Sequence, residues 1–194
     1  VAGAVPALDE SEALRAAEAA IGRIVPDLPL LDRSGRPVRL SDYRGKPLLV
    51  SFIYTGCFQV CPTSSRALRR AVQGMRERFG DAQFNVVSIG FNQPTDSPQA
   101  LRQFAAQQRI DEPNWEFLSP AAGDVAALAR DFGFSFAPTP IGFDHTLQVS
   151  VLDAEANLGL EGNEAFLRDV PSSNELEETL AYHGLDRFVV RKEI

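Results

Sequence analysis

The stretch LLVSFIYTGCFQVCPTSS, residues 48–65, is the most informative about the fold, because a short turn with both cysteines joins an apolar run to a helix start. Residues 48–54 are almost wholly apolar, which is typical of a strand that is buried on both faces of a sheet. Cys57 follows this run, and Cys61 stands where the first turn of the next helix is expected. Pro62 costs little there, since the first N–H groups of a helix have no partner within it. We therefore expect both thiols at the carboxyl end of a central strand.

The chain of 194 residues has no other cysteine, and the spacing favours a functional pair. Two side chains four residues apart lie on one face of a helix. Both sulfurs can then converge beside the helix N-terminus, where free N–H groups and the helix dipole stabilise a thiolate. The usual redox motif has two spacer residues. A third leaves room for a cation, and soft thiolates select Cu(I). Two inert cysteines or a structural disulfide are the alternatives.

Two thiolates leave a copper ion incompletely coordinated, and His145 is the candidate third ligand. It precedes an apolar run that we expect to join the sheet, which would bring its loop beside the cysteine-bearing helix start. Asp144 or a backbone carbonyl could fix the ring tautomer. The alternative is a loop histidine packed under the helix. His183, the other histidine, falls in the last turn of a predicted helix, and we expect it on the surface.

Other metal and catalytic chemistries fit the sequence less well. A zinc site built from both cysteines and both histidines is disfavoured, because the histidines lack the short spacing of a zinc finger. The serines have no nucleophile-elbow context and the glycines form no phosphate loop. We expect Met75 in the core. We expect Asp96, Glu112 and Asp131 to be helix caps and solvated charges.

Composition limits the partners that the chain can have. Hydrophobic residues make up 44% and charged residues 23%, as in an ordinary globular protein. A net charge of −7 disfavours nucleic acid and anionic membrane surfaces. No run of 18 apolar residues predicts a membrane span. Because the sequence starts without Met or a basic region, we expect that an export signal or membrane anchor has been removed.

The order of predicted elements indicates a layered α/β domain. Helices are predicted over residues 10–22 with Ser11 as N-cap, 61–79, 96–109 with Asp96 or Ser97 as N-cap, 122–134 and 172–184. Strands are predicted over 48–54, 82–91 and 114–119, and hairpins within 27–40 and 145–162. Strands that alternate with helices predict a three-layer sandwich, and the last hairpin adds antiparallel edges.

Four segments, in this order, resemble the Sco/SenC family of copper chaperones. The first, LVSFIYTGCFQVCPTSS, is similar to the family's apolar strand followed by Cys-x-x-x-Cys-Pro and a helix, and the second, VSIGFNQPTDSPQAL, is similar to its strand followed by Asp-Thr-Pro and a helix. The third, NWEFLS, matches the family's Trp-x-x-Leu segment. The fourth, FDHTLQVSVLDAEANL, matches its Asp-His, strand, Asp and turn. The resemblance covers residues 24–160. The chain departs from the family in two regions. Between the cysteines it has Phe58, Gln59 and Val60, where many members carry an Asp, and residues 160–180 follow no family pattern.

The resemblance implies an α/β thioredoxin-like sandwich with a central mixed sheet and an added N-terminal hairpin. Residues 1–23 would be a helical extension after a removed signal or anchor, 24–184 the Sco domain, and 185–194 a C-terminal tail. Copper, as Cu(I) or Cu(II), would be held by Cys57, Cys61 and His145. We expect a monomer that is tethered on the periplasmic side of a bacterial inner membrane, or faces the mitochondrial intermembrane space in eukaryotes.

The resemblance also implies a role in cytochrome c oxidase assembly. The chain would deliver copper to the dinuclear site of subunit II or another periplasmic copper protein, with a thiol reductant protein as a second partner. The alternative is a thiol–disulfide reductase in which Cys57 attacks and Cys61 resolves. A peroxidase is disfavoured, since a Thr-x-x-Cys setting with a supporting Arg is absent. A copper or redox sensor stays open, and so does the question whether the chain is an enzyme.

Overall fold

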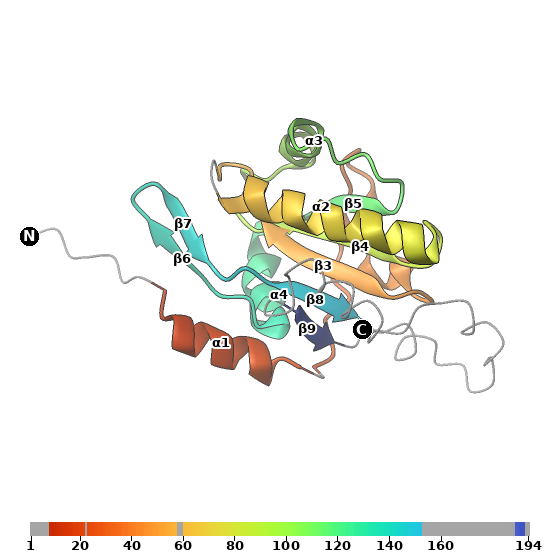
Figure 1. Ribbon diagram of the computed structural model, residues 1–194. Helices are drawn as coiled ribbons and strands as arrows, with labels where there is room; N and C mark the ends of the chain where they lie inside the picture. Colours follow the sequence, from red (N-terminus) through yellow and green to blue (C-terminus); the bar gives the residue numbers. More distant parts are fainter. Residues whose placement is uncertain (1–7, 22, 58–59, 153–188, 193–194) are drawn as a thin grey trace, which may run out of the picture.

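The computed structural model describes residues 8–21, 23–57, 60–152 and 189–192, and Figure 1 shows their arrangement. Seven strands form one sheet in the order β2-β1-β5-β4-β3-β8-β9. Their bounds are β1 Leu30–Leu31, β2 Pro37–Val38, β3 Leu48–Ile53, β4 Asn85–Gly90, β5 Trp115–Pro120, β8 Val149–Leu152 and β9 Val189–Lys192. A separate hairpin pairs β6 Phe136–Thr139 with β7 Gly142–His145.

The middle of the sheet is parallel and its flanks are antiparallel. β3 runs parallel to β4, and β4 parallel to β5, while β8 joins the other side of β3 in the antiparallel sense. β1 pairs antiparallel with β5 and with β2, which adds an N-terminal hairpin to the sheet. Every residue of β3 is buried, as its apolar run predicts. The predicted mixed α/β sheet with an added hairpin is therefore confirmed.

Helices cover both faces of this sheet. They are α1 Glu10–Ala19, α2 Val60–Phe79, α3 Pro98–Gln107 and α4 Val125–Phe132, with short 3₁₀ helices η1 Leu40–Tyr43 and η2 Ala122–Asp124. In Figure 1, α2 and α3 lie on one side and α1 and α4 on the other. The parallel connections β3-α2-β4 and β4-α3-β5 advance in one direction, and right-handed crossovers then place both helices on the same face. None of the helices described is long and apolar enough to cross a membrane.

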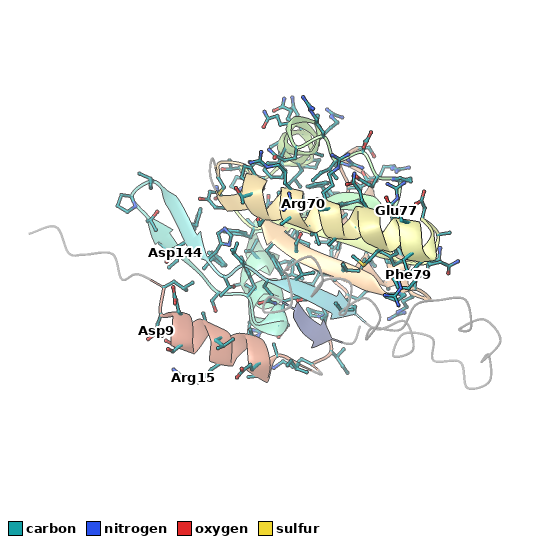
Figure 2. The ribbon with its side chains drawn as sticks, in the orientation of Figure 1. Asp9, Arg15, Arg70, Glu77, Phe79 and Asp144 are labelled. Atoms are coloured by element: carbon teal, nitrogen blue, oxygen red, sulfur yellow. The ribbon has the colours of Figure 1, made fainter. Side chains whose placement is uncertain are left out.

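α2 follows the helical periodicity that the sequence predicts. Leu68, Val72 and Met75 face the core and are buried, whereas Arg70 and Glu77 are exposed to solvent (Figure 2). The expected core position of Met75 is confirmed. The helix ends before Gly80, whose φ of 92° lies in the left-handed region that favours glycine.

α1 packs on α4 through small side chains. A Cβ at Gly133, which caps α4 with a φ of 64°, would lie 2.5 Å from the carbonyl oxygen of Ala16 and 2.7 Å from the Cβ of Ala20. Only glycine therefore allows the two helices to approach so closely. The N-cap of α1 is Asp9, which accepts the Glu12 N–H at 3.0 Å, and the expected cap at Ser11 is wrong. Both residue types cap well, so local sequence does not separate them.

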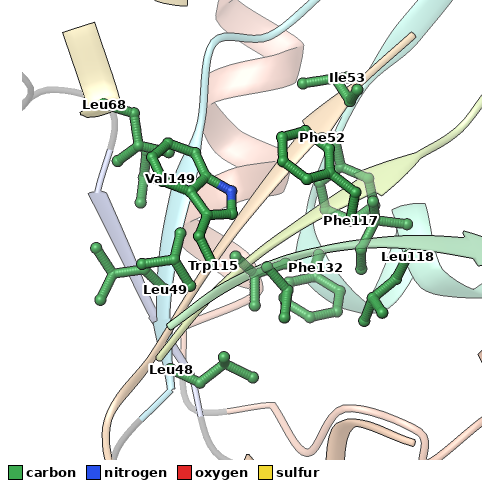
Figure 3. Close-up of a cluster of buried hydrophobic side chains, with 14 of the residues drawn as sticks. Leu48, Leu49, Phe52, Ile53, Leu68, Trp115, Phe117, Leu118, Phe132 and Val149 are labelled. Carbon is green, nitrogen blue, oxygen red and sulfur yellow. The ribbon is translucent and has the colours of Figure 1, made fainter. Parts of the chain in front are cut away.

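The core lies where β3, β5 and β8 meet the helices (Figure 3). Its largest fully buried side chains include Trp115, Phe117 and Phe132, and the Trp115 and Phe117 rings stack with a 6.1 Å separation of centroids. The one polar group of the Trp115 indole is satisfied, because Nε1 donates to Ser88 Oγ at 3.0 Å. This apolar centre fixes the strands that carry the site.

The structure also differs from the sequence expectations in two of its elements and in two buried carboxylates. The hairpin β6–β7 was not expected, and residues 189–192 pair as the edge strand β9 where no element is predicted. The predicted hairpin within 145–162 and the helix over 172–184 lie largely or wholly outside the described residues. Asp96 and Glu112 are not solvated: Asp96 has no exposed surface, and Glu112 is buried in an ion pair with Arg69. A nearby donor can hold a buried carboxylate, which local sequence does not reveal.

Candidate metal centre

The turn between β3 and α2 arranges both cysteines around a helix start. The Cys57 N–H donates to the carbonyl oxygen of Tyr54 at 3.2 Å, which closes the turn after β3. α2 begins at Val60, so Cys61 lies in its first turn. The Cys61 N–H donates to Cys57 Sγ at 3.1 Å. The free N–H groups at the start of α2 thus serve the first sulfur, as expected for a thiolate site at a helix N-terminus.

His145 reaches the cysteines from the end of β7. Its Nε2 lies 3.6 Å from Cys61 Sγ, across 84 positions of sequence. On the other side of the ring, Nδ1 lies 3.0 Å from the carbonyl oxygen of Thr146. Because a carbonyl can only accept, we assign the proton to Nδ1, which leaves the Nε2 lone pair facing the sulfur. A backbone carbonyl therefore orients the ring, while Asp144 is exposed on β7 (Figure 2).

Together, Cys57, Cys61 and His145 offer one ligand atom each, and these atoms all lie within 4.8 Å of one another. Metal–sulfur bonds of about 2.3 Å and metal–nitrogen bonds of about 2.0 Å place the ligands of a shared ion roughly 3.5–4 Å apart. Small side-chain movements suffice to close around an ion. Two thiolates and a neutral imidazole are the soft and intermediate ligands that suit Cu(I) and Cu(II).

The two thiols are not joined by a disulfide and are both buried, but they differ in their electrostatics. Burial raises the pKa of the Cys61 thiol far above its ordinary value, and the neighbouring Cys57 and Asp96 add to this effect. At Cys61, desolvation therefore outweighs any stabilisation of a thiolate by the helix N-terminus, since the Cys61 N–H points to Cys57. A metal ion must displace a proton from Cys61.

Aromatic side chains surround the imidazole. The His145 ring centroid lies 5.6 Å from that of Phe91, and 5.9 Å from those of both Tyr54 and Phe134. Phe136, which faces His145 across the hairpin, packs on Phe91 at 4.8 Å. This shell keeps water from one side of the ring and lowers the local dielectric constant, which strengthens ligand–metal attraction.

Sequence reasoning missed the role of Asp96. Its Oδ1 accepts both the N–H and the hydroxyl of Thr55, at 2.8 and 2.7 Å, and its Oδ2 accepts the Asn92 N–H at 2.8 Å. Burial raises the pKa of this carboxyl, while the hydrogen bonds from Thr55 and Asn92 oppose that effect. The carboxylate thus fixes the chain two residues before Cys57. Its position in the short loop between β4 and α3 is the signal that could have indicated a role at the sheet edge.

The remaining site expectations concern residues that the structure does not describe. His183, Phe58 and Gln59 lie outside the described residues, as does the side chain of Val60. The expected surface position of His183 and the effect of replacing an Asp between the cysteines therefore stay predictions.

The fold and the geometry of the site together indicate the structural class of the protein. A mixed sheet carries two cysteines at the N-terminus of the helix after a central strand, and a histidine from a distant hairpin completes the cluster. That is a thioredoxin-like domain whose two thiols lie beside an imidazole, a combination that could hold a metal ion.

The chain belongs to the SCO1/SenC family, whose model matches residues 16–161. An SCO1 protein homolog of Bacillus subtilis is 26% identical over 120 residues, which cover 61% of each chain. A Stutzerimonas stutzeri protein, named as a candidate copper-binding protein, is 26% identical over 75% of this chain and 68% of its own length. The first match thus spans less than two thirds of the relative.

Solved structures share the fold. Arabidopsis thaliana ScoI with copper bound matches with a TM-score of 0.63 and 18% identity, over 82% of this chain and 97% of its own. A SCO1/SenC family lipoprotein of Bacillus anthracis str. Ames matches with a TM-score of 0.62 and 20% identity, over 69% of this chain and 80% of its own. BsSco matches with a TM-score of 0.58 and 19% identity, over 69% of this chain and 78% of its own. It is described as having a disulfide switch and as a member of the Sco family of cytochrome c oxidase assembly proteins. At these identities the likeness establishes the thioredoxin-like fold.

Proposed function

We propose that this protein is a copper-binding metallochaperone that holds one ion between Cys57, Cys61 and His145. The convergence of two sulfurs and one imidazole nitrogen within 4.8 Å carries this proposal. Membership of the SCO1/SenC family supports it, and so do the copper bound to Arabidopsis ScoI and the name of the Stutzerimonas relative.

The chemistry of the cluster fits a carrier that takes up copper and releases it. Binding of Cu(I) replaces the thiol protons with the metal, and the Nε2 lone pair supplies the third bond without loss of a proton. His145 is only partly buried, so a ligand from a partner can approach on its side. The ion would then leave by stepwise exchange of ligands, which avoids a free aqueous copper ion.

We further propose that the recipient is the dinuclear copper site of cytochrome c oxidase subunit II or another periplasmic copper protein. The description of BsSco as a cytochrome c oxidase assembly protein supports this assignment, and the Bacillus anthracis lipoprotein supports an anchored domain outside the inner membrane. The net charge of −7 is consistent with protein partners rather than nucleic acid.

A second function, thiol–disulfide reduction, is favoured by the same pair of reduced cysteines. Cys57 would attack a partner disulfide and Cys61 would resolve the mixed disulfide. The pair gives up two electrons and two protons and becomes a disulfide, while the partner gains two thiols. The disulfide switch described for BsSco agrees with such a use. Oxidation would also release bound copper, since a disulfide is a poor ligand.

Titration of the reduced protein with Cu(I) against a chromophoric chelator tests the carrier function. We expect one ion per chain for the wild type, weaker binding for His145→Ala, and loss of binding for Cys57→Ser and Cys61→Ser. His183→Ala is the matched histidine control and should bind as the wild type does. On addition of Cu(II), a thiolate-to-copper absorption band should appear in the wild type and change in His145→Ala.

Two other outcomes discriminate between the functions. If the reduced wild type retains no copper at equimolar loading, the carrier function is wrong. If His145→Ala then reduces a protein disulfide as fast as the wild type, the reductase becomes the better description.

A further inference from the structure

The candidate metal centre joins two parts of the fold that are not hydrogen-bonded into one sheet. The cysteines lie at the end of β3 and the start of α2, whereas His145 is carried by the hairpin β6–β7, a two-stranded sheet of its own within the described chain. The tip of this hairpin projects from the body in Figure 1, and Ile141 at the tip is 94% exposed. The distance from His145 to the sulfurs therefore depends on what fastens the hairpin to the body.

Tyr54, the residue after β3, fastens it through its hydroxyl group. The hydroxyl donates to the carbonyl oxygen of Phe143 at 3.4 Å and accepts the Phe143 N–H at 3.3 Å. A phenol can make both bonds at once. Gly142 accommodates this contact, because a Cβ there would lie 2.7 Å from the hydroxyl oxygen. The hairpin backbone thus rests directly on the Tyr54 side chain.

The same residue also holds the cysteine turn. Its carbonyl oxygen accepts the Cys57 N–H at 3.2 Å. Its ring, only 6% exposed, meets the rings of Phe143 and His145 at centroid separations of 5.3 and 5.9 Å. One buried residue therefore contacts the turn of the first sulfur, the backbone of the hairpin and the imidazole.

We propose that Tyr54 is a positioning residue that couples the cysteine turn to the histidine hairpin and keeps His145 within reach of the metal. The proposal deepens the proposed copper function and rests on it. The hydroxyl fixes the hairpin backbone two residues before His145, so that the imidazole need not be recruited when copper binds. Phe91 and Phe134 also touch the imidazole, but both contacts are apolar and set no register along the hairpin.

Tyr54→Phe isolates the hydroxyl, because it leaves the ring contacts in place. Loss of two hydrogen bonds to the hairpin should lower Cu(I) affinity about three- to tenfold, and should shift the Cu(II) band toward that of His145→Ala. Tyr43→Phe, on η1, is the matched control and should change neither the Cu(I) affinity nor the Cu(II) band. Gly142→Ala tests the same contact from the hairpin side, with Gly80→Ala as control, since Gly80 also has a positive φ but a Cβ there meets nothing within 4 Å.

A double-mutant cycle tests whether Tyr54 acts through the histidine. We expect Tyr54→Phe to change copper affinity in the wild-type background and to have a smaller effect in the His145→Ala background, since the Tyr54 side chain also interacts with Cys57. An equal effect in both backgrounds would mean that Tyr54 acts on the cysteines alone and would overturn the proposal. Unchanged affinity and spectrum in Tyr54→Phe would overturn it as well.

A measurement without metal separates this proposal from the copper function. In the reduced protein, Tyr54→Phe should speed hydrogen exchange at the Phe143 amide and shift the His145 ring resonances, while the amides of β4 stay protected. If the wild type binds no copper yet this exchange effect appears, the proposed function fails and the coupling of the hairpin stands. If exchange at Phe143 is unchanged, the coupling is wrong whatever the protein binds.

Discussion

Cys57 and Cys61 have different surroundings although four positions separate them. Cys57 Sγ accepts a hydrogen bond from the start of α2, whereas Cys61 is fully buried and its pKa is raised by desolvation. A thiolate is therefore easier to form on Cys57. This difference agrees with the order expected for a redox pair, in which the first cysteine attacks and the second resolves.

Asp96 shows how a single buried carboxylate holds this turn in place. Asp96→Ala removes the acceptor for the Thr55 N–H and hydroxyl and for the Asn92 N–H, and should lower the free energy of unfolding by about 2–4 kcal/mol. Denaturant unfolding measures this loss, and amide exchange at Thr55 should accelerate. Asp111→Ala, whose side chain is 91% exposed, is the control and should have little effect. Wild-type stability in Asp96→Ala would contradict the assignment.

The helices α2 and α3 and the strand β3 can be predicted from the local sequence pattern, whereas the hairpin β6–β7 cannot. α2 and α3 form where periodicity and caps predict them, including the N-cap of α3 at Ser97, which accepts the Ala100 N–H at 3.2 Å. β3 is buried throughout, as its apolar run indicates. The hairpin β6–β7 has no strong alternating pattern, and its aromatic residues pack against Tyr54 and Phe91, far away in sequence. Its existence depends on the body that it covers.

The β1–β2 hairpin allows a test by pH. Burial raises the pKa of Asp32, but hydrogen bonds from Ser34 and Arg36 outweigh it and lower the pKa from 3.8 to about 2. Because the folded-state pKa is depressed, the carboxylate stabilises the fold above pH 3.8, and this contribution is lost as the pH falls toward 2. Asp32→Asn should therefore be less stable than the wild type at pH 7, and the difference should shrink below pH 4.

Urea unfolding at several pH values measures this difference. Asp124→Asn is the control, because Asp124 makes no capping hydrogen bond on α4, and it should show no comparable trend. A stability difference for Asp32→Asn that is the same at pH 7 and pH 3 would contradict the assignment.

For the whole molecule, copper should act as a crosslink between distant parts of the native chain. Any ligand that binds the folded state better than the unfolded state stabilises the fold, by about 4 kcal/mol at a thousandfold excess over its Kd. The cysteines stay close together in the unfolded chain and keep some affinity for Cu(I), whereas His145, 84 positions from Cys61, joins them only after folding.

Cu(I) should therefore raise the midpoint of thermal unfolding of the reduced wild type, and raise it less in His145→Ala. The double variant Cys57→Ser/Cys61→Ser should show no shift. Differential scanning calorimetry with and without one equivalent of Cu(I) measures the three shifts. Equal shifts in the wild type and His145→Ala would show that the histidine adds nothing to the folded site.

The features that depend on neighbours along the chain could be inferred from the sequence: the buried strand, the helix with the second cysteine in its first turn, and the proximity of two thiols at that helix start. The resemblance of the sequence to a known family also indicated His145. The burial of Asp96, the contact of Tyr54 with both the turn and the hairpin, and the pairing of residues 189–192 with β8 became visible in the folded chain alone. Local conformational preference and hydrophobic period act over a few residues, whereas burial, desolvation and hydrogen bonds between distant segments exist only when the chain has folded.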